Sequence, residues 1–278
     1  MNRRLKSFLQ KGNIYHPLQT TYRSARTFLE NIYHRLTYRR YKGSGYTCNF
    51  CGAQYTRFIP EYPGPDIAGA IERNAVIAGY GENVYCPGCG SKNRERLIKA
   101  VIEKYIPFTN SKTLHFSPEK NLYSWLRTQA PVITADTAPR FYTNIDPRIR
   151  QADATRLPFE ENSFDLVIAN HILEHIPDDA KAMRGIHRVL TATGVAILQV
   201  PYSLTLPTTI EEPGIDDPQL QAALFGQCDH VRIYALADYL HRLKTAGFRV
   251  QTLTPDTLAE FHPHAIQQNE SVFLCYKH

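Results

Sequence analysis

The chain has 278 residues, of which 43% are hydrophobic and 21% are charged, and its formal net charge is +6. This composition excludes a disordered chain, and the absence of any apolar run of about 18 residues excludes a membrane-spanning helix. The basic N-terminal stretch lacks the apolar core of a cleavable secretion signal. We therefore expect a cytoplasmic protein with room for one α/β domain and a small additional module.

The positive charge is concentrated at the start of the chain. Residues 1–45 hold ten Lys or Arg and one acid, Glu30, which gives +9 and leaves 6 − 9 = −3 for the rest. Within residues 18–41, apolar side chains recur at helical spacing, at Leu18, Tyr22, Ala25, Leu29, Ile32, Tyr33 and Leu36. The pattern predicts a basic helical leader over 1–45 that ends at a flexible joint, Gly43-Ser44-Gly45. Such a helix suits RNA, a membrane surface or a partner protein.

Residues 46–98 contain two cysteine pairs. Cys48 and Cys51 stand in CNFCG, and Cys86 and Cys89 stand in CPGCG, so a glycine that permits a tight turn follows each pair. Four thiolates complete a tetrahedral structural zinc site and leave no open position for catalysis. We expect a zinc-ribbon module, in which the 34 residues at positions 52–85 form an insertion that loops out. Four unrelated reduced cysteines are the alternative.

From residue 99 onward, short apolar runs alternate with amphipathic stretches. The expected strands are 113–117, 132–135, 149–152, 164–169, 195–200, 248–253 and 272–276, and the expected helices are 119–128, 178–190 and 234–246. This alternation predicts an α/β domain over 99–278 with a Rossmann-like, doubly wound, mostly parallel seven-stranded sheet. Ligands bind such sheets at the carboxyl ends of the strands.

Residues 153–201, DATRLPFEENSFDLVIANHILEHIPDDAKAMRGIHRVLTATGVAILQVP, resemble the central region of class I S-adenosylmethionine (SAM)-dependent methyltransferases. CPGCGSKNRERL, LHFSPEKNLYSWL and FGQCDHVRIY further resemble a subgroup with an N-terminal zinc ribbon, some of whose members are linked to glycan or natural-product pathways. The resemblance covers about residues 46–278. It implies that the chain binds SAM and a structural zinc ion.

Carried over by position, the resemblance implies a cofactor site along the strand ends. The first strand–helix turn contains Phe116, Ser117 and Glu119 and lacks the usual glycine, so close backbone approach is in doubt. A carboxylate after the second strand would accept hydrogen bonds from both ribose hydroxyls, and Asp136 and Asp146 are both candidates.

Further along the chain, Asp153 and Ala154 would read the adenine amino group, and Asn170 would face the sulfonium. An alcohol or amine acceptor needs a base with a pKa near neutral, for which His171 and His230 are the candidates.

Substrate contacts are expected from His175, Asp229 and Arg232, the last of which could bind an anionic group. A structural role for Glu174 and His175 in the turn is an equal alternative. The segment 171–175 also fits the H-x-x-E-H pattern of zinc peptidases, but it follows a buried strand and meets Pro177, so both histidines would not share one helix face.

Three functions remain open. The first is methyl transfer to an O or N atom of a small molecule or of a glycan or natural-product intermediate. The second is an RNA methyltransferase that grips RNA with the zinc ribbon and the basic leader. The third, motivated by the missing glycine, is a non-catalytic scaffold that binds no SAM.

Overall fold

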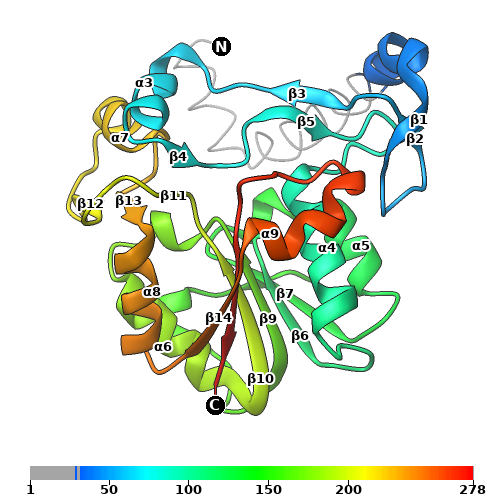
Figure 1. Cartoon of the computed structure of the whole chain (residues 1–278). Coiled ribbons are helices and arrows are strands. Elements are labelled where there is room, and N and C mark those ends of the chain that lie inside the picture. Colours follow the sequence, from blue (N-terminus) through cyan, green and yellow to red (C-terminus); the bar gives the residue numbers. More distant parts are fainter. Residues whose placement is uncertain (1–28, 30–31, 278) are drawn as a thin grey trace, which may run out of the picture.

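The computed structural model describes residue 29 and residues 32–277 (Figure 1). Most of the predicted leader helix, including Leu18, Tyr22 and Ala25, lies outside these residues. Residues 32–37 are helical and continue into the 3-10 turn η1 (Tyr38–Tyr41). None of the described helices is long and apolar enough to cross a membrane.

The strands are β1 (Lys42–Thr47), β2 (Gln54–Tyr55), β3 (Ile59–Glu61), β4 (Val76–Ile77), β5 (Gly81–Tyr85), β6 (Thr113–Phe116), β7 (Val132–Asp136), β8 (Arg150–Gln151), β9 (Phe164–Asn170), β10 (Leu190–Gln199), β11 (Tyr202–Ser203), β12 (Ile210–Glu211), β13 (Arg232–Ala235), β14 (Arg249–Leu253) and β15 (Val272–Tyr276). The helices are α3 (Pro65–Arg73), α4 (Asn93–Tyr105), α5 (Lys120–Leu126), α6 (Asp179–Val189), α7 (Pro218–Phe225), α8 (Leu236–Thr245) and α9 (Pro255–Leu258). Four short 3-10 turns complete the elements: η2 (Pro139–Phe141), η3 (Ala154–Arg156), η4 (Leu173–His175) and η5 (Ala259–His264).

The main sheet has seven strands in the order β14-β15-β10-β9-β6-β7-β8. Every neighbouring pair is parallel except the two that involve β15. The prediction of a Rossmann-like, mostly parallel seven-stranded sheet is therefore confirmed. Figure 1 shows α6 and α8 on one face of this sheet and α4, α5 and α9 on the other.

The alternation of side chains along β9 builds a core on each face. Val167 and Ala169 pack toward α6 and α8, whereas Leu166 and Ile168 pack toward α4 and α5. All four side chains are fully buried. A strand that is covered on both faces reads as a continuous apolar run, which is why FDLVIA identified it in the sequence.

The N-terminal module caps the carboxyl ends of the parallel strands (Figure 1). Its insertion does not loop out into solvent. Instead, β4 pairs with β11 of the α/β part, with Ile77 opposite Tyr202 and Val76 opposite Ser203, in a second sheet of order β12-β13-β11-β4. Helix α3 packs against α7, and α4 runs across the expected boundary at residues 98 and 99.

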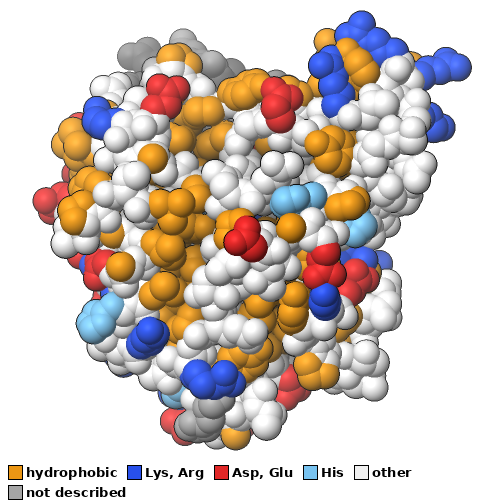
Figure 2. Space-filling model, viewed as in Figure 1, with side chains coloured by type: hydrophobic (Ala, Val, Ile, Leu, Met, Phe, Trp, Pro, Cys, Tyr) orange, Lys and Arg blue, Asp and Glu red, His pale blue; other side chains and the backbone are white. Residues whose placement is uncertain are grey.

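The prediction of a flexible joint at Gly43-Ser44-Gly45 is wrong, because these residues form part of β1, which pairs with β2. Gly45 is needed there for close approach, since a Cβ at this position would lie 2.7 Å from the carbonyl oxygen of Tyr55. Basic side chains gather over η1 and β1 at the upper right of Figure 2, where Arg39, Arg40 and Lys42 are exposed.

Candidate functional site

The four cysteines of the two predicted pairs lie together. Their sulfur atoms are all within 4.8 Å of one another, with Cys48 and Cys89 at 3.6 Å and Cys51 and Cys86 at 3.7 Å. Sulfurs bound tetrahedrally at about 2.3 Å from a zinc ion are about 3.8 Å apart, whereas disulfide sulfurs are about 2.05 Å apart. The cluster therefore fits a tetrahedral metal and not two disulfides.

The two cysteine turns have the same backbone geometry. In the first turn, Cys48 N donates to Ala53 O and Gly52 N donates to Cys48 O. In the second turn, Cys86 N donates to Ser91 O and Gly90 N donates to Cys86 O. Gly52 and Gly90 both have positive φ, +69° and +74°. This repeated turn aims both thiols of each pair at one point, as the following glycines predicted. Arg35 donates to the carbonyl of Gly88 and ties the leader to the second turn.

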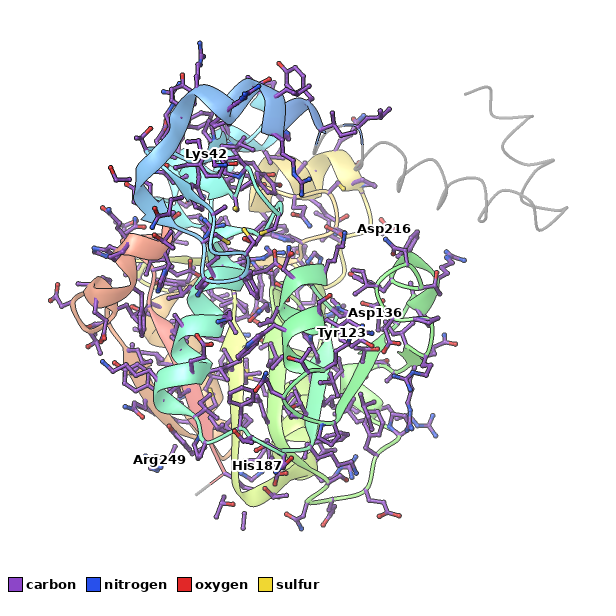
Figure 3. All side chains as sticks on the ribbon, turned by 90° about the vertical axis from the view of Figure 1, so that its right-hand side faces the viewer. Lys42, Tyr123, Asp136, His187, Asp216 and Arg249 are labelled. Carbon is purple, nitrogen blue, oxygen red and sulfur yellow. The ribbon has the colours of Figure 1, made fainter. Side chains whose placement is uncertain are left out.

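A cavity of about 850 Å³ lies at the carboxyl ends of β6, β7, β8 and β9. Ten of the residues predicted for the site line it: Phe116, Ser117, Glu119, Asp136, Asp153, Ala154, Asn170, His171, His175 and Asp229. Its volume lies within the about 300–1,000 Å³ of ligand and cofactor pockets. Figure 3 shows Asp136 at the end of the sheet that faces the N-terminal module.

Ser117 replaces the expected glycine of the first turn and adopts its backbone conformation. Its φ is +44°, in the left-handed region that favours glycine. Its hydroxyl donates to Oδ2 of Asp136 at 2.6 Å, and Ala138 N donates to Oδ1 at 2.6 Å. A carboxylate offers about four lone-pair sites, so Asp136 keeps acceptor capacity toward the cavity.

Asp146, the rival candidate, does not line the cavity. It is 3% exposed, and its carboxylate accepts from the hydroxyl of Thr134 at 2.7 Å and from Arg148 N at 3.0 Å. Burial raises the pKa of Asp146, but these hydrogen bonds outweigh burial and leave the pKa below its ordinary value. The structure thus gives Asp146 a role in holding the loop after β7, and Asp136 is the carboxylate that faces the cavity.

Glu119 is the centre of a polar network at the start of α5. Its carboxylate accepts from His115 Nε2 at 3.0 Å and from Asn170 Nδ2 at 3.4 Å, and it lies 3.3 Å from Arg94 Nε. Burial raises the pKa of Glu119, but the bond from His115 and the charge of Arg94 lower it below the ordinary value. The network presents a fixed cation and a fixed anion to the cavity.

A second cavity, of about 230 Å³, lies between the insertion and the sheet. The insertion and the start of α4 contribute Glu61, Ile71, Val76, Tyr80, Lys92 and Asn93; the α/β part contributes Glu174, Pro201, Phe225 and His230. Arg94, His171, His175 and Gln227 line both cavities, so the two cavities adjoin at these residues.

His171 stands at this junction in a constrained conformation. Its φ is +53°, and its backbone N–H donates to Gln199 O. Its Nδ1 lies 3.5 Å from Oε1 of Glu174, and its buried Nε2 has no hydrogen-bond partner in the described structure. Glu174 is 1% exposed. Burial raises the pKa of Glu174, but His171, His175 and His230 outweigh burial and lower the pKa to about 2.

His175 and His230 lie beside each other with ring centroids 4.6 Å apart. Burial lowers the pKa of His230 to about 4, so its ring is neutral at pH 7. Burial also lowers the pKa of His175, but the hydrogen bond to Asp229 and the charge of Glu174 outweigh burial and raise the pKa to about 9. The imidazole rings of His175 and His230 therefore differ in protonation state at pH 7, although they lie side by side.

The expectation that Arg232 binds substrate is not met. Its side chain is 1% exposed and lines neither cavity. The guanidinium donates to the carbonyls of Leu173, Ile176 and Pro177 and to the carboxylate of Glu211. Arg232 therefore clamps η4, which carries Glu174 and His175, to the segment that carries His230.

Sequence reasoning missed the residues that the insertion and α4 bring to the site. Arg94 stood within the segment CPGCGSKNRERL, but nothing in its spacing showed that the start of α4 reaches the strand ends. Glu61 and Lys92, which pair at 3.1 Å beside the smaller cavity, carried no signal either.

Comparison with known proteins shows similarity to methyltransferases. Residues 119–198 match the model of a methyltransferase domain. A protein of Mycolicibacterium smegmatis named "probable S-adenosylmethionine-dependent methyltransferase" is 31% identical over 121 residues, which are 44% of this chain and 40% of that protein. A mitochondrial arginine-hydroxylase of Mus musculus is 29% identical over 131 residues, 44% of this chain and 35% of that protein. The chain thus spans less than half the length of these two relatives.

Among solved structures, a SAM-dependent methyltransferase from Mesorhizobium loti is similar, with a TM-score of 0.45 and 15% identity over 64% of this chain and 96% of that one. The domain match and the curated methyltransferase relative support a class I SAM-dependent methyltransferase domain in this chain. The domain match, residues 119–198, does not extend to the cysteine cluster.

Proposed function

We propose that this protein transfers a methyl group from SAM to an O or N atom of a small polar molecule, or of the end of a glycan or natural-product intermediate. The observation that carries the proposal is the pair of adjoining cavities, a larger one with the predicted cofactor residues and a smaller polar one, that meet at His171. SAM supplies a methyl group on a positively charged sulfur, so the protein mainly needs to align the acceptor.

The lining of the larger cavity offers groups that fit three parts of SAM: the ribose, the amino-acid end and the adenine. The carboxylate of Asp136 would accept hydrogen bonds from the ribose hydroxyls. The Arg94 guanidinium and the Glu119 carboxylate, 3.3 Å apart, would bind the carboxylate and the ammonium of the amino-acid end. Asp153 and Ala154, at the start of η3, would contact the adenine.

The acceptor would enter the smaller cavity. Its volume of about 230 Å³ is below the range of about 300–1,000 Å³ for pockets that hold drug-sized ligands. A small molecule, or the end of a longer one, is therefore favoured over a folded nucleic acid. The lining includes charged and polar side chains such as Glu61, Lys92 and Asn93, so a polar acceptor fits.

His171 would act as the general base at the junction. Its Nδ1 faces Glu174, whose carboxylate would stabilise the imidazolium, while the unpartnered Nε2 can accept a proton from the acceptor. Removing that proton would raise the nucleophilicity of the acceptor oxygen or nitrogen. His175, which lines both cavities, would orient the acceptor, and Asn170 would face the sulfonium from the larger cavity.

The four cysteines would hold a structural zinc ion. The cluster geometry fits a closed tetrahedral set, and the ion would fix the two cysteine turns against each other. Reduced thiols of this kind are compatible with a cytoplasmic protein. The module would then support the insertion that completes the acceptor cavity.

The test is calorimetric titration of the full chain with SAM, with Asp136→Asn and Asp146→Asn as a matched pair. Asp136→Asn removes one or two charge-assisted hydrogen bonds, worth about 1.5–3 kcal/mol each. We therefore expect this variant to bind SAM about 10- to 100-fold more weakly than the wild type, or weaker still. Asp146→Asn, away from the cavity, keeps its affinity within about threefold if it folds. Equal losses by the two variants would refute the assignment of Asp136 to the ribose, and no binding by the wild type at millimolar SAM would refute the proposed function and favour the scaffold.

A further inference from the structure

We propose that Glu174, His175 and His230 form a binding site for a divalent metal ion, separate from the cysteine cluster, whose open positions hold the acceptor. One ligand atom from each of the three residues lies within 4.8 Å of the others. All three side chains line the smaller cavity. The acceptor part of this inference rests on the proposed function, whereas the metal site itself does not.

The carboxylate of Glu174 is the strongest evidence for a cation-binding site. The residue is 1% exposed, and neither of its oxygens has a hydrogen-bond partner within the described structure. The nearest ring nitrogens, His171 Nδ1 at 3.5 Å and His230 Nε2 at 3.9 Å, are too distant for good hydrogen bonds. A buried carboxylate without hydrogen bonds is costly, and buried charges are normally paired or bound to metals, so an ion shared with the neighbouring imidazoles would satisfy Glu174.

Both histidines have the second contact that metal-binding imidazoles usually make. His175 Nδ1 lies 3.2 Å from the carbonyl oxygen of Asp229 and 3.4 Å from its Oδ1. His230 Nδ1 lies 3.4 Å from the carbonyl oxygen of Phe225. When Nδ1–H donates to such an acceptor, the ring orientation is fixed. The neutral ring of His230 then offers the lone pair of its Nε2 to a metal, and the ion would displace the Nε2 proton of His175 on binding.

The backbone around the three residues is tied together from both sides. Val231 N donates to the carbonyl oxygen of Glu174 at 3.0 Å, and Arg232 donates to three carbonyls of residues 173–177. The ligands are thus held by a rigid frame although 55 positions separate His175 from His230. Ligand atoms around an ion at about 2.0–2.2 Å are about 3–3.5 Å apart, so the side chains would close by about 1 Å on binding.

Two imidazoles and one carboxylate leave coordination positions open, as catalytic metal sites do. The open side faces the smaller cavity, next to His171. A hydroxyl oxygen of the acceptor bound there would have its pKa lowered by the ion, and His171 would take the proton. The O–H bond breaks, the electron pair stays on oxygen, and that oxygen then attacks the methyl carbon while the carbon–sulfur pair leaves with sulfur.

The test uses Mn²⁺, which is visible by electron paramagnetic resonance and suits mixed imidazole–carboxylate sites, whereas four thiolates favour zinc. The zinc-loaded full chain is titrated without SAM. We expect wild type to bind one Mn²⁺ per chain and Glu174→Gln and His230→Asn each to weaken binding at least tenfold. Asp178→Asn is the matched control, since Asp178 lies nearby in the larger cavity and Asn also caps helix α6.

Failure of the wild type to bind Mn²⁺, or equal binding by all variants, would overturn the metal site. Glu174→Gln and His230→Asn are both made, so that the test survives if one of them fails to fold. The Mn²⁺ affinity of each variant is compared only if its thermal unfolding midpoint matches that of Asp178→Asn. SAM titration of the same samples separates the two proposals. Mn²⁺ binding without SAM binding would refute the proposed function, and SAM binding without Mn²⁺ binding would refute only the metal site.

Discussion

Replacing Arg96 tests whether the zinc module and the α/β part form one folding unit. Arg96 is fully buried in α4, and no acidic side chain among the described residues forms an ion pair with it. Its guanidinium donates to five backbone carbonyls, those of Asn83, Val84, Ser91, His264 and Ala265. These carbonyls belong to β5, the second cysteine turn and the end of η5, so one side chain joins the zinc module to a segment about 170 positions away.

Arg96→Met keeps an unbranched apolar stem but removes every donor. Each buried carbonyl left without a partner costs about 1–3 kcal/mol, and some will find water or another donor. We therefore expect the free energy of unfolding to fall by about 3–5 kcal/mol, as when one partner leaves a buried charged network. Zinc retention should weaken too, because Arg96 Nη1 lies 3.4 Å from Ser91 Oγ, which lies 3.3 Å from the sulfurs of Cys48 and Cys89.

Urea unfolding followed by circular dichroism and by zinc release measures both effects. Arg127→Met, at an exposed arginine that follows α5, is the matched control and should change stability by less than about 0.5 kcal/mol. A loss below about 1 kcal/mol for Arg96→Met, or separate unfolding transitions for the two parts in the wild type, would show that Arg96 does not join them into one folding unit.

Three further predictions follow from single contacts. Cys86→Ser should lower bound zinc from one ion per chain to none and reduce the thermal midpoint, whereas Cys228→Ser, at an exposed thiol, should change neither; equal zinc contents by elemental analysis would contradict this. Gly185→Ala should destabilise the protein by about 1–3 kcal/mol, because its Cβ would lie 2.7 Å from Ala154 O. Gly69→Ala, in open space within α3, should instead stabilise it by about 0.5–1 kcal/mol. The midpoints of denaturant unfolding of the two variants and the wild type test both expectations. Hydrogen bonds from Arg242 lower the pKa of Glu211, so Glu211→Gln should reduce the free energy of unfolding by about 1–2 kcal/mol at neutral pH. This loss should be present above the unfolded-state pKa of about 4.3 and vanish as the pH falls through the lower folded-state pKa. A stability difference between wild type and variant that grows in acid would contradict this prediction.

The regular elements of the α/β part were predictable because their patterns are local. Residues 272–276 and 164–169 read as strands from their apolar runs, and Asp178 marked the start of α6, where its side chain accepts from Lys181 N. The cysteine turns were predictable for the same reason, since the thiols and the following glycines lie within five residues of one another.

The arrangement of the site depends on contacts between distant segments, which local patterns do not contain. The choice between Asp136 and Asp146 is decided by the hydroxyl of Thr134, which turns Asp146 inward. The meeting of Glu174 with His230 depends on a clamp by Arg232, a residue that sequence reasoning assigned to substrate.

The N-terminal part held the largest differences. Two glycines suggested a joint, but Gly45 serves a close approach to β2. The insertion has weak local signals, and its short strand β4 forms only because β11 offers an edge to pair with. A two-residue strand of this kind cannot be predicted without its partner.

The most direct test of the account is transfer of a deuterated methyl group from labelled SAM. The full chain is incubated with a cell extract that has been separated into a small-molecule filtrate and an RNA fraction, and products are read by mass spectrometry. We predict a labelled product in the filtrate that His171→Ala reduces at least 100-fold. Labelled RNA, or no labelled product from a protein that binds SAM, would contradict the account.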